Sequence, residues 1–208
     1  MKITISEILD KIELLFPDAG CELNYHNLYE LAISVILSAQ TTDISVNKVT
    51  VKLFEKYPNI NSLANAKSQD VEKLIRNLGL YRNKSKNIIA FAKQIEHEFN
   101  GTIPNNRDDL IRLAGVGRKT ANVILSEFYH VPAIAVDTHV ERVSKRLQLA
   151  AENDSVLQVE LKLQKKIPKE RWSQSHHLFI FFGRYQCKAI KPICTECPFK
   201  ENCTYQKK

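Results

Sequence analysis

Long uncharged apolar runs are missing from this sequence, and their absence argues against a membrane-spanning helix. The longest apolar stretch covers residues 31–39, far short of the ~20 residues that cross a bilayer. Near the N-terminus, Glu7, Asp10, Lys11 and Glu13 interrupt the apolar pattern, so the hydrophobic core of a secretory signal peptide does not form. We therefore expect a cytoplasmic protein that is not secreted and has no membrane partner.

Sustained strand-like alternation is also absent, as are low-complexity segments and obvious linkers. Apolar residues recur instead at the i, i+3, i+4 and i+7 positions of buried helix faces. The first such face is predicted to contain Leu28, Leu31, Ala32, Val35, Ile36 and Ala39. Similar patterns lie within residues 46–54, 74–78 and 84–99, and a loop with Pro104 precedes a further helix expected at about 107–114. We predict an all-α fold.

Cysteine is scarce before residue 187, where Cys21 stands alone. The other four cysteines are Cys187, Cys194, Cys197 and Cys203, with the spacing C-x6-C-x2-C-x5-C. Without an export signal, such a cluster indicates a metal site before disulfides. Four thiolates bind either zinc or a [4Fe–4S] cluster, and the residue chemistry alone leaves both open.

Acidic residues are the minority charge, with 23 Asp and Glu against 30 Lys and Arg and a formal net charge of +7. A basic excess of this size suits a polyanionic partner, usually a nucleic acid. An ordinary protein with a high isoelectric point explains the composition equally well. Composition alone therefore does not separate a nucleic-acid-binding protein from an ordinary basic protein, whereas sequence motifs can.

Glycine is rare as well, with six in the chain, yet two of them stand together in Gly115-Val116-Gly117. Paired glycines allow a sharp turn that exposes backbone N–H groups. A helix beginning near Arg118 would direct its N-terminal N–H groups and positive dipole end to the same side, which suits a DNA phosphate. A plain corner between two helices is the alternative interpretation of the glycines.

Lys119 and Asp137 are the candidate catalytic residues. A lysine in the first turn of a helix, beside Arg118, meets an unfavourable dipole and a like charge, and both favour the neutral, nucleophilic amine. Asp137 follows a short apolar run and precedes a helix, so it can cap that helix, stabilise positive charge on a reacting sugar, or do both. A solvated surface lysine and a simple helix cap are the ordinary alternatives.

With these residues, the chain closely resembles the endonuclease III family of bifunctional DNA glycosylases. The motifs that carry the resemblance occur in family order and cover essentially the whole chain. They are LSAQTTD at 37–43, GLYRNKSKNI at 79–88, LAGVGRKTANVIL at 113–125, VDTHVERV at 136–143 and the cysteine tail. The resemblance implies a two-lobed all-α helix-hairpin-helix fold, with one domain at 22–131 and the other formed by 1–21 plus 132–208.

The resemblance also implies a reaction. Lys119 matches the catalytic lysine that forms a Schiff base at the sugar, and Asp137 matches the catalytic aspartate. The implied substrate is double-stranded DNA with oxidised pyrimidines or abasic sites, in bacterial-type nucleoid DNA. The enzyme would remove the flipped base and then break the strand by β-elimination, and we expect it to act as a monomer.

DNA-binding roles follow from the same resemblance. Gln40 matches the residue that fills the space vacated by the flipped base, and Leu80 matches an apolar wedge. The hairpin residues expected at a phosphate are Gly115, Val116, Gly117 and Arg118. The cysteine spacing matches the family's [4Fe–4S] site, whose loop would present Lys188 and Lys191 to DNA. Ala114 departs from the family pattern, which usually has proline there, and we expect some loss of loop rigidity.

Three rival interpretations remain at this stage. An adenine-specific mismatch glycosylase shares the hairpin, aspartate and cluster, but lacks the lysine and carries an extra C-terminal domain. A non-catalytic helix-hairpin-helix module explains the charge and the glycines, but leaves Lys119 and Asp137 without a purpose. A zinc-bearing structural protein would be colourless, which separates it from an iron–sulfur protein.

Overall fold

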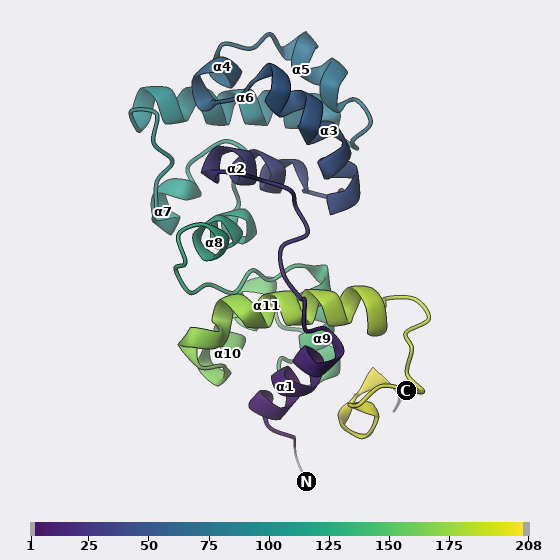
Figure 1. Ribbon diagram of the computed structural model, residues 1–208. Helices are drawn as coiled ribbons and strands as arrows, with labels where there is room; N and C mark the ends of the chain where they lie inside the picture. Colours follow the sequence, from purple (N-terminus) through teal and green to yellow (C-terminus); the bar gives the residue numbers. More distant parts are fainter. Residues whose placement is uncertain (1–2, 206–208) are drawn as a thin grey trace. The chain divides into compact units, whose positions relative to one another are not determined.

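The computed structural model describes residues 3–205, and within them the regular structure is entirely helical (Figure 1). The predicted all-α fold is confirmed. Contacts divide the chain into a continuous unit, residues 22–129, and a discontinuous unit, residues 1–21 with 130–208. These units lie close to the two expected domains, whose boundary at residue 131 stays a prediction.

The continuous unit is built around one helix, α2 (Leu28–Leu37), whose residues from Leu31 to Leu37 are all buried. A helix that is apolar on every side belongs inside its unit. Helix α2 packs against α3 (Asp43–Lys56), α6 (Tyr81–Glu98) and α8 (Arg118–Glu127). The other helices of this unit are α4 (Ile60–Ala64), α5 (Ser68–Ile75) and α7 (Arg107–Leu110). The expectation of a single buried face on α2 was therefore too narrow. Ala39, expected on that face, lies beyond the helix and is exposed.

Helix ends agree with local capping chemistry at most positions. Thr42 caps α3 by accepting a hydrogen bond from the Ser45 backbone N–H at 3.3 Å, and Asn106 caps α7 in the same way through Asp109 at 2.9 Å. The α7 helix ends at Leu110, so the helix expected at 107–114 is shorter than predicted. The helix expected at 84–99 begins earlier, at Tyr81.

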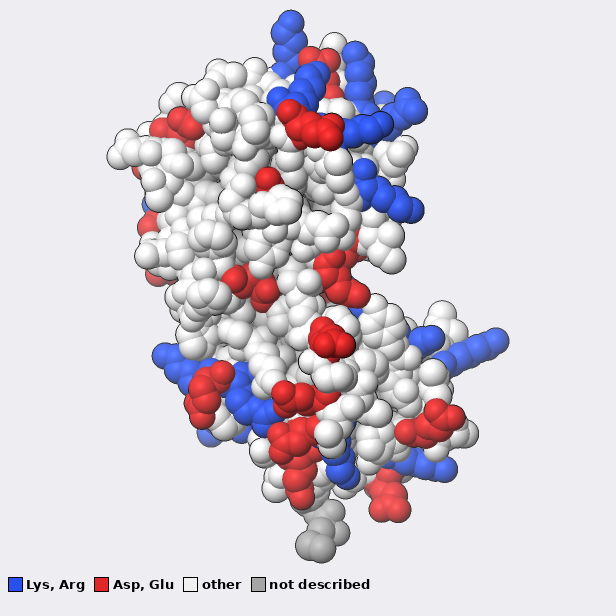
Figure 2. Space-filling model, viewed as in Figure 1, with Lys and Arg blue, Asp and Glu red and all other residues white. Residues whose placement is uncertain are grey.

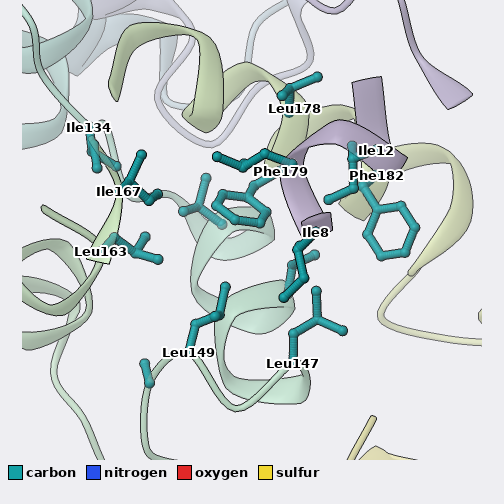
Figure 3. Close-up of a cluster of buried hydrophobic side chains, with 14 of the residues drawn as sticks. Ile8, Ile12, Ile134, Leu147, Leu149, Leu163, Ile167, Leu178, Phe179 and Phe182 are labelled. Carbon is teal, nitrogen blue, oxygen red and sulfur yellow. The ribbon is translucent and has the colours of Figure 1, made fainter. Parts of the chain in front are cut away.

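The discontinuous unit has its own hydrophobic core, seen in Figure 3. Its helices are α1 (Ile5–Leu15), α9 (Thr138–Arg146), α10 (Val156–Lys166) and α11 (Trp172–Phe181). Ile8 and Ile12 of α1 meet Phe179 and Phe182 in this core, which fastens the N-terminal segment to residues more than 100 positions later. A π-helical turn, Phe182–Gln186, then leads to the cysteines.

No helix within residues 3–205 is long and apolar enough to cross a membrane. The face shown in Figure 2 carries Lys and Arg side chains interspersed with Asp and Glu, and neither sign covers it. The net charge of +7 is therefore not displayed as a uniform basic surface from this side.

Candidate functional site

The glycine-containing turn forms a compact hairpin between α7 and α8. Gly115 has φ +77°, in the left-handed region, and the Val116 backbone N–H donates to the Leu113 carbonyl at 3.1 Å. The Arg107 Nε donates to Asn122 Oδ1 at 2.8 Å, which ties the first turn of α7 to α8. The hairpin is thus held on both sides of the turn.

The two hairpin glycines are required for different reasons. A Cβ on Gly115 would lie 2.9 Å from Ile36 Cγ2 and 3.1 Å from Asn87 Cβ, so both its φ angle and its packing favour glycine. A Cβ on Gly117 would meet nothing within 4 Å, and its φ is −93°. The fold needs Gly115, whereas the exposed backbone of Gly117 faces open space that a ligand can approach.

Ala114 uses a backbone group that proline lacks. Its N–H donates to Gln94 Oε1 at 2.8 Å, and Gln94 Nε2 donates to the Arg112 carbonyl at 3.4 Å. Gln94 of α6 therefore holds the residues just before the turn. These hydrogen bonds from Gln94 restrain the loop and so act against the loss of rigidity expected from the missing proline. The loss itself stays a prediction.

Lys119 is exposed and is the second residue of α8, as expected. Gly117 is the N-cap, and glycine has no side chain to accept a hydrogen bond from the helix. Arg118 and Lys119 therefore stand at the positive end of the helix dipole without an acidic residue in that turn. This arrangement attracts anions to the start of α8.

Asp137 is half-buried and is the N-cap of α9. Its Oδ1 accepts hydrogen bonds from the backbone N–H groups of His139 and Val140, both at 2.8 Å. Both bonds of the cap end on one oxygen, so Oδ2 takes no part in capping. The same carboxylate can hold the helix and present a negatively charged oxygen.

His139, next to this cap, makes structural contacts. Arg142 Nη2 lies 3.2 Å from its Nδ1, and a Cβ on Gly183 would come within 2.8 Å of its Cβ. Burial lowers the pKa of His139, while the nearby Asp137 carboxylate opposes this effect. The side chain packs where α9 meets the π-helical turn, which fits a structural histidine.

Gln40 and Leu80 both lie in the continuous unit, and both have left-handed backbones, with φ values of 53° and 56°. Both side chains are exposed, Leu80 at 58%. Left-handed conformations in bulky residues cost about 1–2 kcal/mol each, and such strain concentrates at functional sites. Leu80 is moreover the N-cap of α6, a position that an apolar side chain cannot serve.

The four C-terminal cysteines line one pocket of the discontinuous unit, together with Pro192, Ile193 and Tyr205. Burial raises the pKa of Cys187 and of Cys197, and a hydrogen bond from Arg146 opposes this at Cys187. Cys21 is half-buried and lies apart from this group in the sequence.

Two arginines of α9 hold the loop between Cys187 and Cys194. Arg146 Nη1 donates to Cys187 Sγ at 3.3 Å and to the Lys188 carbonyl at 2.8 Å. Arg142 Nε donates to the Cys187 carbonyl at 3.1 Å. Lys188 and Lys191 are exposed on this loop, as expected from the spacing.

Sequence reasoning missed Arg142 and Arg146. The available signal was their i, i+4 spacing along one side of α9, next to the buried face of Val140 and Val143. That spacing predicts a shared basic face, but not which loop the face contacts. It also missed Lys84, a lysine on the otherwise apolar stripe of α6.

Comparison with protein families and curated relatives gives consistent matches. Residues 33–169 match the family described as HhH-GPD superfamily base excision DNA repair protein. The chain is 53% identical over 195 residues to endonuclease III of Bacillus subtilis, covering 94% of this chain and 89% of that protein. It is 42% identical over 202 residues to endonuclease III of Escherichia coli K12, covering 97% and 95%.

Solved structures give the same result. A trapped endonuclease III–DNA covalent intermediate superposes with a TM-score of 0.95 at 52% identity, covering 99% of this chain and 98% of that one. A non-covalent endonuclease III–DNA complex has a TM-score of 0.95 at 53% identity, covering 98% and 95%. A thermostable thymine-DNA glycosylase, at 22% identity and a TM-score of 0.85, shares the fold.

Proposed function

Since the chain belongs to the endonuclease III family of base excision DNA repair glycosylases, we propose that it removes oxidised pyrimidines through Lys119 and Asp137. The family's enzymes are bifunctional, joining glycosylase and abasic-site lyase activities. One observation carries the assignment to residues: Lys119 stands exposed in the first turn of α8, directly after the hairpin. The proposed substrate is duplex DNA, bound by a monomer with one domain at 22–131 and the other formed by 1–21 plus 132–208.

The proposed chemistry begins with the neutral Lys119 amine attacking C1′ of the damaged nucleotide. The bond from C1′ to the base nitrogen breaks, and the base leaves with the electron pair. Loss of the amine proton and opening of the sugar ring give a Schiff base between Nζ and C1′. Removal of a C2′ proton then expels the 3′ phosphate, so the strand breaks by β-elimination.

Asp137 has the complementary role. Its carboxylate stabilises the positive charge that develops on the sugar as the base departs, and it assists the proton transfers that follow. The cap geometry supports this role, because both helix bonds end on Oδ1 and Oδ2 takes no part in them. The helix bonds also orient the carboxylate.

The proposed DNA contacts involve groups of two kinds. Backbone N–H groups of Gly115 and Gly117 and the Arg118 side chain bind a phosphate, while the Val116 N–H stays bonded to the Leu113 carbonyl. Lys188 and Lys191 add cations from the cysteine loop. Gln40 and Leu80 enter the duplex, Gln40 in the vacated space and Leu80 as a wedge beside it. The exposure and left-handed backbones of both residues support the insertion role.

Replacement of the two glycines by alanine is expected to separate folding from DNA binding. Gly115→Ala should destabilise the protein by about 2–4 kcal/mol, because a left-handed backbone and a close contact add together. Gly117→Ala should leave the unfolding temperature nearly unchanged but weaken duplex binding, since the new methyl group occupies open space at the phosphate. Thermal unfolding and binding titrations check both. Normal affinity in Gly117→Ala would contradict the phosphate role.

We further propose that the four clustered cysteines bind a [4Fe–4S] cluster. The residues fit: all four line one pocket with apolar neighbours, and the Arg146 N–H approaches Cys187 Sγ. The C-x6-C-x2-C-x5-C spacing also matches the iron–sulfur site of the family to which the chain belongs. A bound cluster would supply positive charge for the four thiolates and hold the loop bearing Lys188 and Lys191.

Metal analysis tests the cluster. The purified protein should be brown and contain about four irons per chain. Cys194→Ser should lose colour and iron and bind duplex DNA more weakly, whereas the matched control Cys21→Ser should keep both. A colourless protein with one zinc ion per chain would overturn the cluster assignment.

Borohydride trapping tests the proposed reaction. One duplex carries thymine glycol and a second carries an abasic site, and we expect a covalent complex with each. Trapping on the abasic duplex alone would establish a lyase and reject thymine glycol as the base substrate. Trapping on neither, with iron present, would overturn the lysine mechanism.

A further inference from the structure

Lys84 is a buried lysine that the proposed reaction does not use. It is 4% exposed and lies on the inward face of α6 with Ile88, Phe91 and Ile95. Lysines are almost never this buried without an opposite charge. Within the described part of the chain, no carboxylate lies within ion-pairing distance, and burial lowers the pKa of Lys84. A solvated surface role does not account for this side chain.

Lys84 contacts two segments, one through its side chain and one through the first backbone hydrogen bond of α6. Its Nζ donates to Thr41 Oγ1, and its backbone N–H donates to the Leu80 carbonyl at 3.0 Å. Thr41 directly follows Gln40, and Leu80 directly precedes α6. One residue therefore contacts the neighbour of one proposed insertion residue and the backbone of the other.

The conformations of these segments explain why a connection is useful. Gln40 and Leu80 have strained left-handed backbones and exposed side chains, so local preference would not hold either one in place. The Thr41 hydroxyl is half-buried, and its bond to Lys84 spans 43 positions in the sequence. A buried hydrogen bond fixes such a distance more firmly than exposed contacts do.

We propose that Lys84 is a positioning residue that holds the Gln40 turn and the Leu80 turn at a fixed separation, so that both enter the duplex together. The proposal rests on the insertion roles assigned above to Gln40 and Leu80. Lys84 itself touches neither the reacting sugar nor the flipped base. Its effect is exerted through the two turns, before the chemical step.

Lys84→Met tests this, because methionine fills a similar volume without a donor or a buried charge. The probe is a duplex with a tetrahydrofuran abasic analogue, with 2-aminopurine opposite the gap to report unstacking. We expect Lys84→Met to lose most of the fluorescence gain. On a separate duplex carrying thymine glycol, it should slow single-turnover base release roughly ten- to a hundred-fold. Affinity for an undamaged duplex should be unchanged, because the phosphate contacts remain. The exposed neighbour Lys86→Met is the matched control and should behave as wild type.

Thr41→Val approaches the same bond from the other side and leaves Lys84 in place. It should reproduce the loss of unstacking, and the double variant should be no worse than Lys84→Met alone, because both remove one interaction. Additive losses of the fluorescence gain would overturn the positioning role of Lys84. So would equal losses on damaged and undamaged duplexes with a lowered unfolding temperature, since these indicate general destabilisation.

Gln40→Ala and Leu80→Ala, measured in parallel, distinguish a wrong role for Lys84 from wrong insertion roles for Gln40 and Leu80. If both variants lose the fluorescence gain and Lys84→Met keeps it, the positioning role of Lys84 is wrong and the insertion roles of Gln40 and Leu80 are supported. If neither variant loses the fluorescence gain, the insertion roles are wrong, and the positioning role of Lys84, which depends on them, is wrong as well. Borohydride trapping through Lys119 is measured separately, and neither outcome changes the result expected for it.

Discussion

Lys119→Gln is expected to abolish borohydride trapping and to lower strand nicking by roughly a thousand-fold or more, the scale seen when a covalent nucleophile is removed. Glutamine is polar and only one bond shorter, but its amide nitrogen is not nucleophilic at C1′. Lys119 is exposed in the first turn of α8, so the fold loses no buried contact. Removal of a cation from that helix end even relieves an unfavourable dipole interaction. Gel assays of trapping and nicking measure the effect.

Arg118→Gln is the matched control, because it removes the same charge one residue earlier. It should weaken duplex binding and reduce its salt dependence by about one counterion, while trapping at saturating enzyme persists. Unchanged nicking in Lys119→Gln would exclude Lys119 as the nucleophile. Equal loss of trapping in both variants would show that binding, and not nucleophilicity, is the common cause.

Asp137→Asn is expected to slow base release by about 10²–10⁴-fold, the usual contribution of a positioned acid or base, while the fold keeps its stability. Asparagine caps a helix as well as aspartate does. The amide oxygen can therefore accept the bonds from His139 and Val140 that Oδ1 now accepts. What disappears is the negative charge beside the developing positive charge. Single-turnover base release and thermal unfolding, measured together, test this separation.

Asp137→Ala provides the second comparison. It removes both the charge and the cap, so it should lose activity and also about 1 kcal/mol of stability. Two results would contradict a catalytic role for this carboxylate. One is full activity in Asp137→Asn with a loss in Asp137→Ala, which would assign it to capping alone. The other is full activity in both variants.

The sequence by itself determined what depends on near neighbours. Gly117, Arg118 and Lys119 read correctly as the start of a helix after a turn, because helix starts and turns are decided within a few residues. The cap at Asp137 was readable for the same reason. The cysteine spacing predicted a common site, and all four cysteines line one pocket. The roles of these residues in catalysis and metal binding stay predictions that the experiments above test.

Tertiary structure decided what depends on residues far apart in the chain. Apolar periodicity predicted one buried face for α2, yet packing on all sides buried the helix from Leu31 to Leu37. Lys84 looks like any other lysine in sequence, and only the fold shows that its ammonium meets Thr41 on another segment. Likewise, only the fold shows that Arg146 donates a hydrogen bond to Cys187 Sγ, 41 positions away. Local patterns record the preferences of the backbone, whereas burial and pairing across such separations arise only when the whole chain has packed.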